Sequence, residues 1–172
     1  EKGINYCVMN NYTFMPEVIP SDVDIALEYK DFKYLDTLVL NLANKHRVAI
    51  TQKIWHGYNK CAYILSPLDI TEYFWLQLDF FVDFCAKGYP NLIPINQMLQ
   101  NKKQYKNFYT PVPKIEVPFI IQRRIIKGDL KVKHLNILHD LYLNENKVIN
   151  EELSNMFGSI LGQVLTKVII DK

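Results

Sequence analysis

The sequence predicts an α+β fold, in which a mixed β-sheet with covering helices occupies residues 1–87 and a helical region follows over residues 88–172. Runs that are rich in β-branched, aliphatic and aromatic residues concentrate in the first half of the chain. Stretches with apolar residues at helical spacing concentrate in the second half. With 172 residues, of which 49% are hydrophobic, the chain is long enough to bury a core.

The stretch PSDVDIAL at residues 20–27 reads as a buried strand that carries two carboxylates. Because side chains alternate between the faces of a strand, Asp22 and Asp24 project together from the face opposite the aliphatic residues. Neighbouring like charges repel, and a divalent cation such as Mg²⁺ relieves this by binding the carboxylate oxygens together with a substrate phosphate. The alternative is that Ser21 and Asp22 open the strand as turn residues and Asp24 lies on a solvated edge.

The segment Tyr73–Phe84, YFWLQLDFFVDF, is the most β-prone part of the chain and should form a central strand. Asp79 is then a carboxylate in a buried strand, so it needs a partner, a metal or a raised pKa. If the two acidic strands are neighbours, Asp22, Asp24 and Asp79 converge around one or two cations, as in phosphoryl or nucleotidyl transfer. Asp83 is the alternative to Asp79, because it lies four residues further along the same face.

These residues resemble a known family. The S-D-V-D-I of residues 21–25 with the L-Q-L-D-F of residues 76–80 is similar to the nucleotidyltransferase superfamily, which includes polymerase-beta-like enzymes, poly(A) polymerases, aminoglycoside nucleotidyltransferases and many small bacterial proteins. The resemblance covers residues 4–84 and implies a nucleotidyltransferase-like sheet. It further implies that Asp22 and Asp24 hold Mg²⁺ or Mn²⁺, and that Asp79 completes the set and assists deprotonation of the acceptor.

The chain departs from that family in the loop before the acidic strand. Family members usually carry a Gly-Ser or Gly-Gly pair there, whose backbone N–H groups cradle the triphosphate, whereas this chain reads Asn-Asn-Tyr-Thr at residues 10–13. Asn11 and Thr13 could donate side-chain hydrogen bonds instead, and with Ser21 they are the candidate nucleotide-binding residues of this region. The expected substrates are a nucleoside triphosphate and a hydroxyl on an unidentified acceptor.

Two alternatives to that activity stay open. A catalytically inactive member would keep the fold as a binding or assembly module, which the missing glycines favour. The nucleotidyltransferase partner of a toxin–antitoxin pair would carry the same carboxylates.

The remaining elements of the first half follow from spacing and turn residues. They are a short strand at Ile4–Met9, a polar loop at residues 10–20, a helix capped by Asp31 that runs to about His46, and two strands, Val48–Ile54 and Cys61–Leu65, that flank a tight turn at residues 56–59.

In the second half, glycine and proline mark a connection at residues 88–94 before the helices begin. The spacing predicts helices at about Ile95–Lys106, at Val117–Lys127 with Pro118 in its first turn and Gly128 at its end, at Leu135–Leu143, and from an N-cap at Asn150 onward.

The densest positive stretch runs from Arg123 to His134 and includes Arg124 and Lys127. Facing the carboxylates, Arg123, Arg124 and Lys127 would bind the triphosphate or an anionic acceptor, the arginines by bidentate contact. Facing outward they form only a basic surface. Consecutive helical residues point in different directions, so the sequence leaves both interpretations open.

The last predicted helix carries a continuous apolar stripe over residues 153–169. A core helix of the C-terminal region is the simpler assignment, and a homodimer contact is the alternative.

Composition excludes several classes of protein. A net charge of +2 does not indicate a nucleic-acid binder, although it leaves one open. Three widely spaced cysteines without a C-x-x-C fit a reduced, cytoplasmic compartment better than a disulfide framework or a zinc site. No run reaches the about 20 apolar residues of a membrane span, so no membrane partner is expected. The chain begins at Glu1 without Met and opens almost directly into a strand, so we expect that a preceding helix has been trimmed or belongs to a longer parent protein.

Overall fold

The computed structural model describes residues 3–69, 71, 73–85, 88–91 and 93–172. The chain forms two compact units. The first comprises Glu1–Phe84 and Pro94–Thr110, and the second comprises Cys85–Ile93 and Pro111–Lys172. Residues 94–110, which the sequence analysis grouped with the C-terminal region, thus belong to the first unit.

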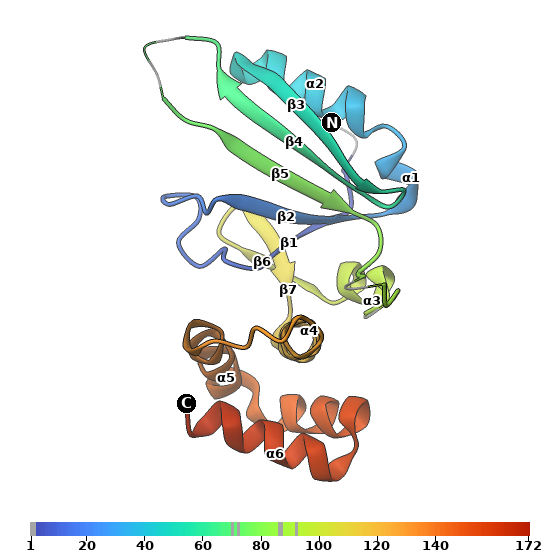
Figure 1. Ribbon diagram of the computed structural model, residues 1–172, viewed down its shortest axis with the longest axis vertical. Coiled ribbons are helices and arrows are strands. Elements are labelled where there is room, and N and C mark those ends of the chain that lie inside the picture. Colours follow the sequence, from blue (N-terminus) through green and yellow to red (C-terminus); the bar gives the residue numbers. More distant parts are fainter. Residues whose placement is uncertain (1–2, 70, 72, 86–87, 92) are drawn as a thin grey trace. The chain divides into compact units, whose positions relative to one another are not determined.

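A five-stranded sheet forms the centre of the first unit, with the order β1-β2-β5-β4-β3 (Figure 1). The strands are β1 Tyr6–Met9, β2 Asp22–Leu27, β3 Val48–Gly57, β4 Lys60–Pro67 and β5 Leu76–Phe81. Strands β2 and β5 are parallel and the other neighbouring pairs are antiparallel. The sheet is therefore mixed, and the predicted α+β class is confirmed.

The register of the two acidic strands positions the candidate site. In the parallel pair Asp24 lies opposite Asp79, and Asp22 lies opposite Gln77. Strand β5 has a neighbour on each side, so its prediction as a central strand is confirmed, although it is shorter than the predicted Tyr73–Phe84. The parallel alignment brings side chains from distant parts of the chain to one face.

One face of the sheet packs against helix α2, Leu35–His46. The buried core there includes Leu27, Leu35, Val39, Tyr63 and Phe80. The single helix predicted from Asp31 is wrong, because the chain forms a short α1 at Tyr29–Phe32 and begins α2 after Tyr34. Tyr34 interrupts the helix with φ −104° and ψ 11°, and Asp31 lies inside α1 instead of capping α2.

The predicted helix Ile95–Lys106 is wrong beyond its first half. Helix α3 spans only Ile95–Gln100, and a two-stranded sheet follows, formed by β6 Lys102–Tyr105 and β7 Phe108–Pro111. Lys106 has a φ of 51° in the turn between these strands. Rings of Tyr105 and Phe108 pack on the buried Tyr12, so tertiary contacts outweigh the weak helical spacing of this segment.

The second unit is helical, with α4 Pro113–Lys127, α5 Val132–Phe157 and α6 Ser159–Ile170. Helix α4 starts one turn before the predicted Val117, so Pro113 lies in its first turn and Pro118 lies inside it. Gly128 ends α4 as predicted, with a φ of 65° that glycine adopts without strain. Helix α5 extends far beyond the predicted Leu135–Leu143 and bends at Glu145, whose φ of −143° is not helical.

The predicted N-cap at Asn150 is wrong, because Asn150 lies inside α5 and the last helix begins after Gly158. Gly158 adopts φ 81° and ψ 157°, which breaks the predicted stripe into two helices. Leu153 of α5 and Leu165 and Ile169 of α6 are buried, whereas the apolar residues at 160, 161, 164 and 168 are exposed. A homodimer through this face stays a prediction. None of the helices in the described part of the chain combines the length and apolar character of a transmembrane segment.

Candidate functional site

Three carboxylates converge on one face of the five-stranded sheet. One oxygen from each of Asp22, Asp24 and Asp79 lies within 4.8 Å of the others. Asp22 and Asp24 come from β2, and Asp79 comes from the adjacent parallel strand β5. The convergence predicted from the two acidic strands is therefore present in the structure.

The protein surrounds these carboxylates with hydrogen-bond donors. Asn10 Nδ2 donates to Asp24 Oδ2 at 2.8 Å, and Gln77 Nε2 donates to Asp79 Oδ1 at 2.8 Å. The more exposed Asp22 accepts a hydrogen bond of 2.9 Å from the Ser21 hydroxyl. Asp24 is 8% exposed and Asp79 is 5% exposed. Both are buried charges whose solvation the protein replaces with its own polar groups.

The closest cation at this site is a lysine that the sequence analysis missed. Lys60 Nζ lies 2.9 Å from Asp79 Oδ2 and 4.0 Å from Asp24 Oδ1. Ala62 pairs with Asp79 across β4 and β5, so Lys60, two residues before Ala62, projects from the same face. That strand pairing could not be read from a linear pattern. The available signal was weak: a lysine that opens a strand directly after a turn.

The donor set suits a hard divalent cation. Three carboxylates and the Lys60 ammonium carry a combined charge of −2. Oxygen ligands of Mg²⁺ lie at about 2.0–2.1 Å, so neighbouring ligands are about 3 Å apart and opposite ligands about 4.2 Å apart. The three carboxylate oxygens lie within 4.8 Å of one another, so they would have to draw closer together around an ion. Asp22, Asp24 and Asp79 are the residues that would hold the ion.

The pKa of the Asp79 carboxyl reflects two opposed effects. Burial raises it, but hydrogen bonds from Lys60 and Gln77 outweigh burial and hold the pKa below its ordinary value of 3.8. Asp79 therefore stays ionised at neutral pH. Such a weakly basic carboxylate is better suited to bind a cation than to accept a proton.

The lowered pKa of Asp79 predicts a pH dependence of stability. The folded-state pKa of Asp79 lies below the unfolded-state value of about 3.8. The ionised carboxylate therefore contributes fully to the free energy of unfolding above pH 3.8, and this contribution is lost as the pH falls through the folded-state pKa. We expect the free energy of unfolding of the wild type to fall more steeply in this range than that of Asp79→Asn. Urea unfolding between about pH 5 and pH 2 measures this difference. Equal slopes for the two proteins would contradict the ion pair.

The other candidate residues of the first unit lie around the loop before β2. Asn11 and Thr13 are exposed, and Asn11 has a positive φ of 48°. Asn10, which the sequence analysis did not single out, is the loop residue that contacts a carboxylate. Asp83, the alternative to Asp79, accepts a hydrogen bond of 3.3 Å from Asn59 Nδ2 and is not part of the acidic cluster. The nucleotide-binding roles of Asn11, Thr13 and Ser21 stay predictions.

The basic candidates belong to the second unit. Arg123, Arg124 and Lys127 lie on α4. Arg124 Nη1 forms an ion pair with Asp129 Oδ2 at 2.9 Å, and the Arg123 guanidinium lies 5.9 Å from the centre of the Phe119 ring. Their role in binding a triphosphate stays a prediction.

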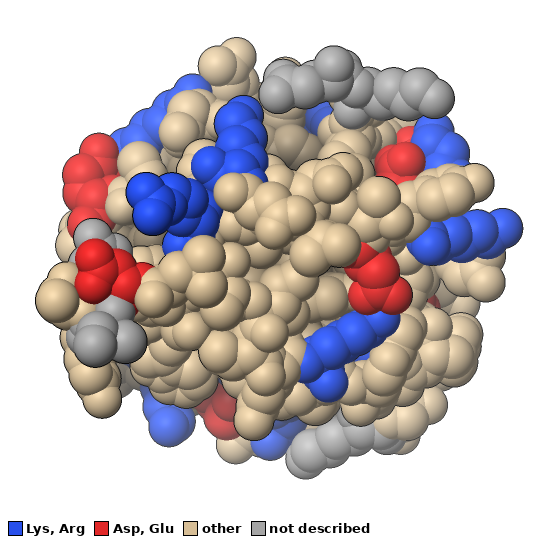
Figure 2. All heavy atoms as spheres, turned by 90° about the horizontal axis from the view of Figure 1, so that it is seen from above, with Lys and Arg blue, Asp and Glu red and all other residues tan. Residues whose placement is uncertain are grey.

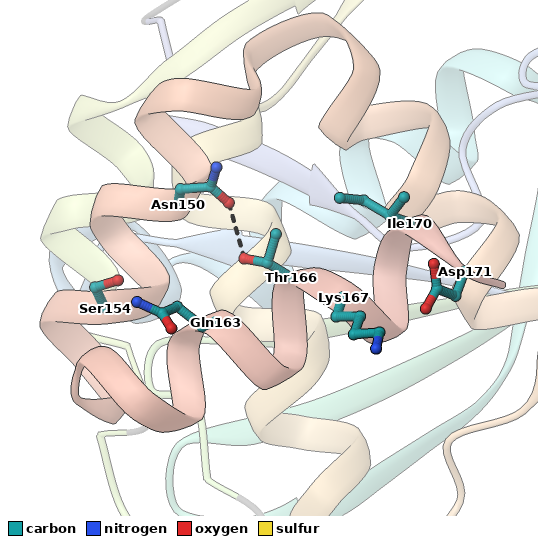
Figure 3. A pocket seen from close by; sticks show the side chains of 7 residues that line it. All are labelled: Asn150, Ser154, Gln163, Thr166, Lys167, Ile170 and Asp171. Atoms are coloured by element: carbon teal, nitrogen blue, oxygen red, sulfur yellow. Dashed lines mark hydrogen bonds between the residues drawn. The ribbon is translucent and has the colours of Figure 1, made fainter.

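Two of the hollows that lie away from the carboxylates are lined in part by polar groups. One, of about 230 Å³, is in the first unit, where Asp36 accepts hydrogen bonds from Lys53 and from the Tyr63 hydroxyl. The other, of about 380 Å³, lies between α5 and α6. Figure 3 shows Thr166 Oγ1 at its wall donating a hydrogen bond of 2.8 Å to Asn150 Oδ1. The polar groups named here satisfy one another, so they point to no particular ligand.

Surface charge adds little to the choice of partner. The face in Figure 2 carries both basic and acidic side chains among uncharged ones. This mixture agrees with the net charge of +2.

Comparisons of the chain with protein-family models, curated proteins and solved structures give no match.

Proposed function

We propose that this protein is a metal-dependent nucleotidyltransferase with a nucleotidyltransferase-type sheet. The observation that carries the proposal is the convergence of Asp22, Asp24 and Asp79 from two neighbouring parallel strands. The three carboxylates carry more negative charge than the single Lys60 ammonium balances, and this favours a divalent cation. The resemblance of residues 21–25 and 76–80 to the superfamily supports the same assignment.

The proposed reaction transfers a nucleoside monophosphate from a nucleoside triphosphate to a hydroxyl of an acceptor. The acceptor oxygen forms a bond to the α-phosphorus, the bond between that phosphorus and the oxygen bridging to the β-phosphate breaks, and pyrophosphate leaves with that oxygen. Asp22, Asp24 and Asp79 would hold Mg²⁺, which when bound would lower the pKa of the attacking hydroxyl and neutralise charge on the phosphates. The hydroxyl proton passes to solvent. A related phosphoryl transfer would use the same site.

The chain's own residues would orient this reaction. Asn10 holds the Asp24 carboxylate from one side, and Gln77 holds the Asp79 carboxylate from the other. Fixed carboxylates impose one arrangement on the substrate, and such positioning supplies most of the catalysis in phosphoryl transfer. Ser21 bonds to Asp22 at the more exposed edge of the cluster, where a triphosphate would enter.

A non-catalytic binding module is the second candidate. It is favoured by the contact of 2.9 Å between Lys60 and Asp79, which neutralises part of the acidic cluster without any metal. The loop at residues 10–13, which lacks glycine, favours it as well.

Thermal unfolding with ligands separates the two candidates. A nucleotide that binds only the folded state raises the unfolding temperature, by an amount equivalent to about 2.7 kcal/mol at a concentration of 100 times Kd. We expect Mg²⁺ with at least one of the four ribonucleoside triphosphates to stabilise the wild type in this way, and Asp22→Asn to lose most of the effect. Asp22 is the least buried of the three carboxylates, so its substitution should leave the fold intact.

Asp140→Asn is the matched control, because Asp140 is exposed on α5 and the substitution removes the same charge. It should respond to Mg²⁺ and nucleotide as the wild type does. Absence of a shift with all four nucleotides would favour the binding module.

A further inference from the structure

We propose that Lys60 is the counter-ion built into the acidic site, and that a divalent cation displaces its ammonium group from the carboxylates toward the phosphates of the substrate. This inference rests on the proposed function, because it concerns how the same site exchanges one cation for another.

The contacts of Lys60 support the first half of the proposal. Its ammonium reaches two buried carboxylates that come from different strands, Asp79 at 2.9 Å and Asp24 at 4.0 Å. These two residues lie directly opposite each other in the parallel pair. Two carboxylates in such a position repel, and a cation between them lowers that cost. In the metal-free protein Lys60 therefore reduces the repulsion between these carboxylates, as a bound metal ion would.

Charge and space support the second half. A divalent cation beside Asp24 and Asp79 would share the Asp79 carboxylate with a like-charged ammonium that lies 2.9 Å from it. Two such cations repel strongly in a partly buried site. Lys60 is the first residue of β4, and its side chain is 30% exposed. The four-carbon lysine side chain is flexible, so its ammonium group can move toward solvent. An ammonium displaced toward solvent would meet the phosphates that the metal binds, and lysine is a good point-charge ligand for phosphate.

Two consequences can be measured without an acceptor. Lys60 competes with the metal, so its removal should strengthen metal binding. The same residue assists phosphate binding, so its removal should weaken binding of a polyphosphate once the metal site is saturated. A lysine that only neutralises the carboxylates would produce the first effect without the second.

The experiment is isothermal titration calorimetry of the wild type and Lys60→Met, first with Mg²⁺ alone and then with inorganic triphosphate at saturating Mg²⁺. We expect Lys60→Met to bind Mg²⁺ at least about tenfold more tightly than the wild type, and to bind triphosphate about tenfold more weakly. Lys60→Arg, which keeps the charge, should stay close to the wild type with Mg²⁺. Lys103→Met, at an exposed position of β6, is the matched control and should change neither affinity.

Unchanged Mg²⁺ affinity in Lys60→Met would overturn the proposal that the metal displaces Lys60 from the carboxylates. Unchanged triphosphate affinity would overturn the proposal that the displaced ammonium contacts phosphate. If Lys60→Met does not fold in metal-free buffer, Lys60→Gln is measured instead, because its amide can still donate to Asp79. Failure of the proposed function gives a different result. Neither the wild type nor any Lys60 variant would then show Mg²⁺ binding that depends on Asp22.

Discussion

Asp24→Asn is expected to raise the stability of the metal-free protein by about 1 kcal/mol, and at the same time to abolish stabilisation by Mg²⁺. The reason is the position of Asp24, a buried carboxylate directly opposite the buried carboxylate of Asp79. Removing one of two facing like charges relieves repulsion and the cost of burying the charge. Asn10 can still donate its hydrogen bond of 2.8 Å, because the amide oxygen of asparagine accepts in place of the carboxylate.

The measurement is urea unfolding of wild type and Asp24→Asn with a chelator and then with excess Mg²⁺. Asp140→Asn again serves as the control for loss of one negative charge, and it should leave both values close to those of the wild type. A less stable Asp24→Asn in metal-free buffer would show that the carboxylate is a structural partner of Asn10 and Lys60. That outcome would favour the non-catalytic module.

The second large effect is expected at Gly162, where α6 crosses α5 with almost no space between them. A Cβ atom on Gly162 would lie 2.9 Å from both Cα and N of Ser154. Both are backbone atoms, so relief requires the helices to separate. We expect Gly162→Leu to destabilise the second unit by about 3 kcal/mol, the upper end of typical overpacking costs. Gly162→Ala should cost less, since the gain of about 1 kcal/mol in helix propensity offsets part of the clash.

Hydrogen exchange of the α6 amides gives the local readout for Gly162→Leu, and thermal unfolding gives the overall loss. Gln163→Leu places the same side chain at the next, exposed position of α6 and should leave exchange protection largely unchanged. Equal protection of α6 in both variants would mean that the two helices separate at little cost.

The acidic strands show how far sequence reasoning can reach. Alternation over residues 22–27 and the aromatic density around Asp79 are local properties, and they correctly predicted two strands with carboxylates on one face. Breaks in helical geometry at Tyr34 and Gly158 were missed, because spacing of apolar residues continues across them. The end of α3 at Gln100 was missed although the apolar spacing stops at Leu99. The hairpin of β6 and β7 was missed because its rings pack on Tyr12, which lies about ninety residues earlier in the chain.

The sequence by itself determined which residues carry charge, which segments favour strands or helices, and which carboxylates share a face of a strand, because these depend on residue type and on the period of the backbone. Only the tertiary structure decided that Asp24 lies opposite Asp79 and that Lys60 reaches both carboxylates. Strand order and register arise from packing between distant segments. A linear pattern of residues does not contain that information.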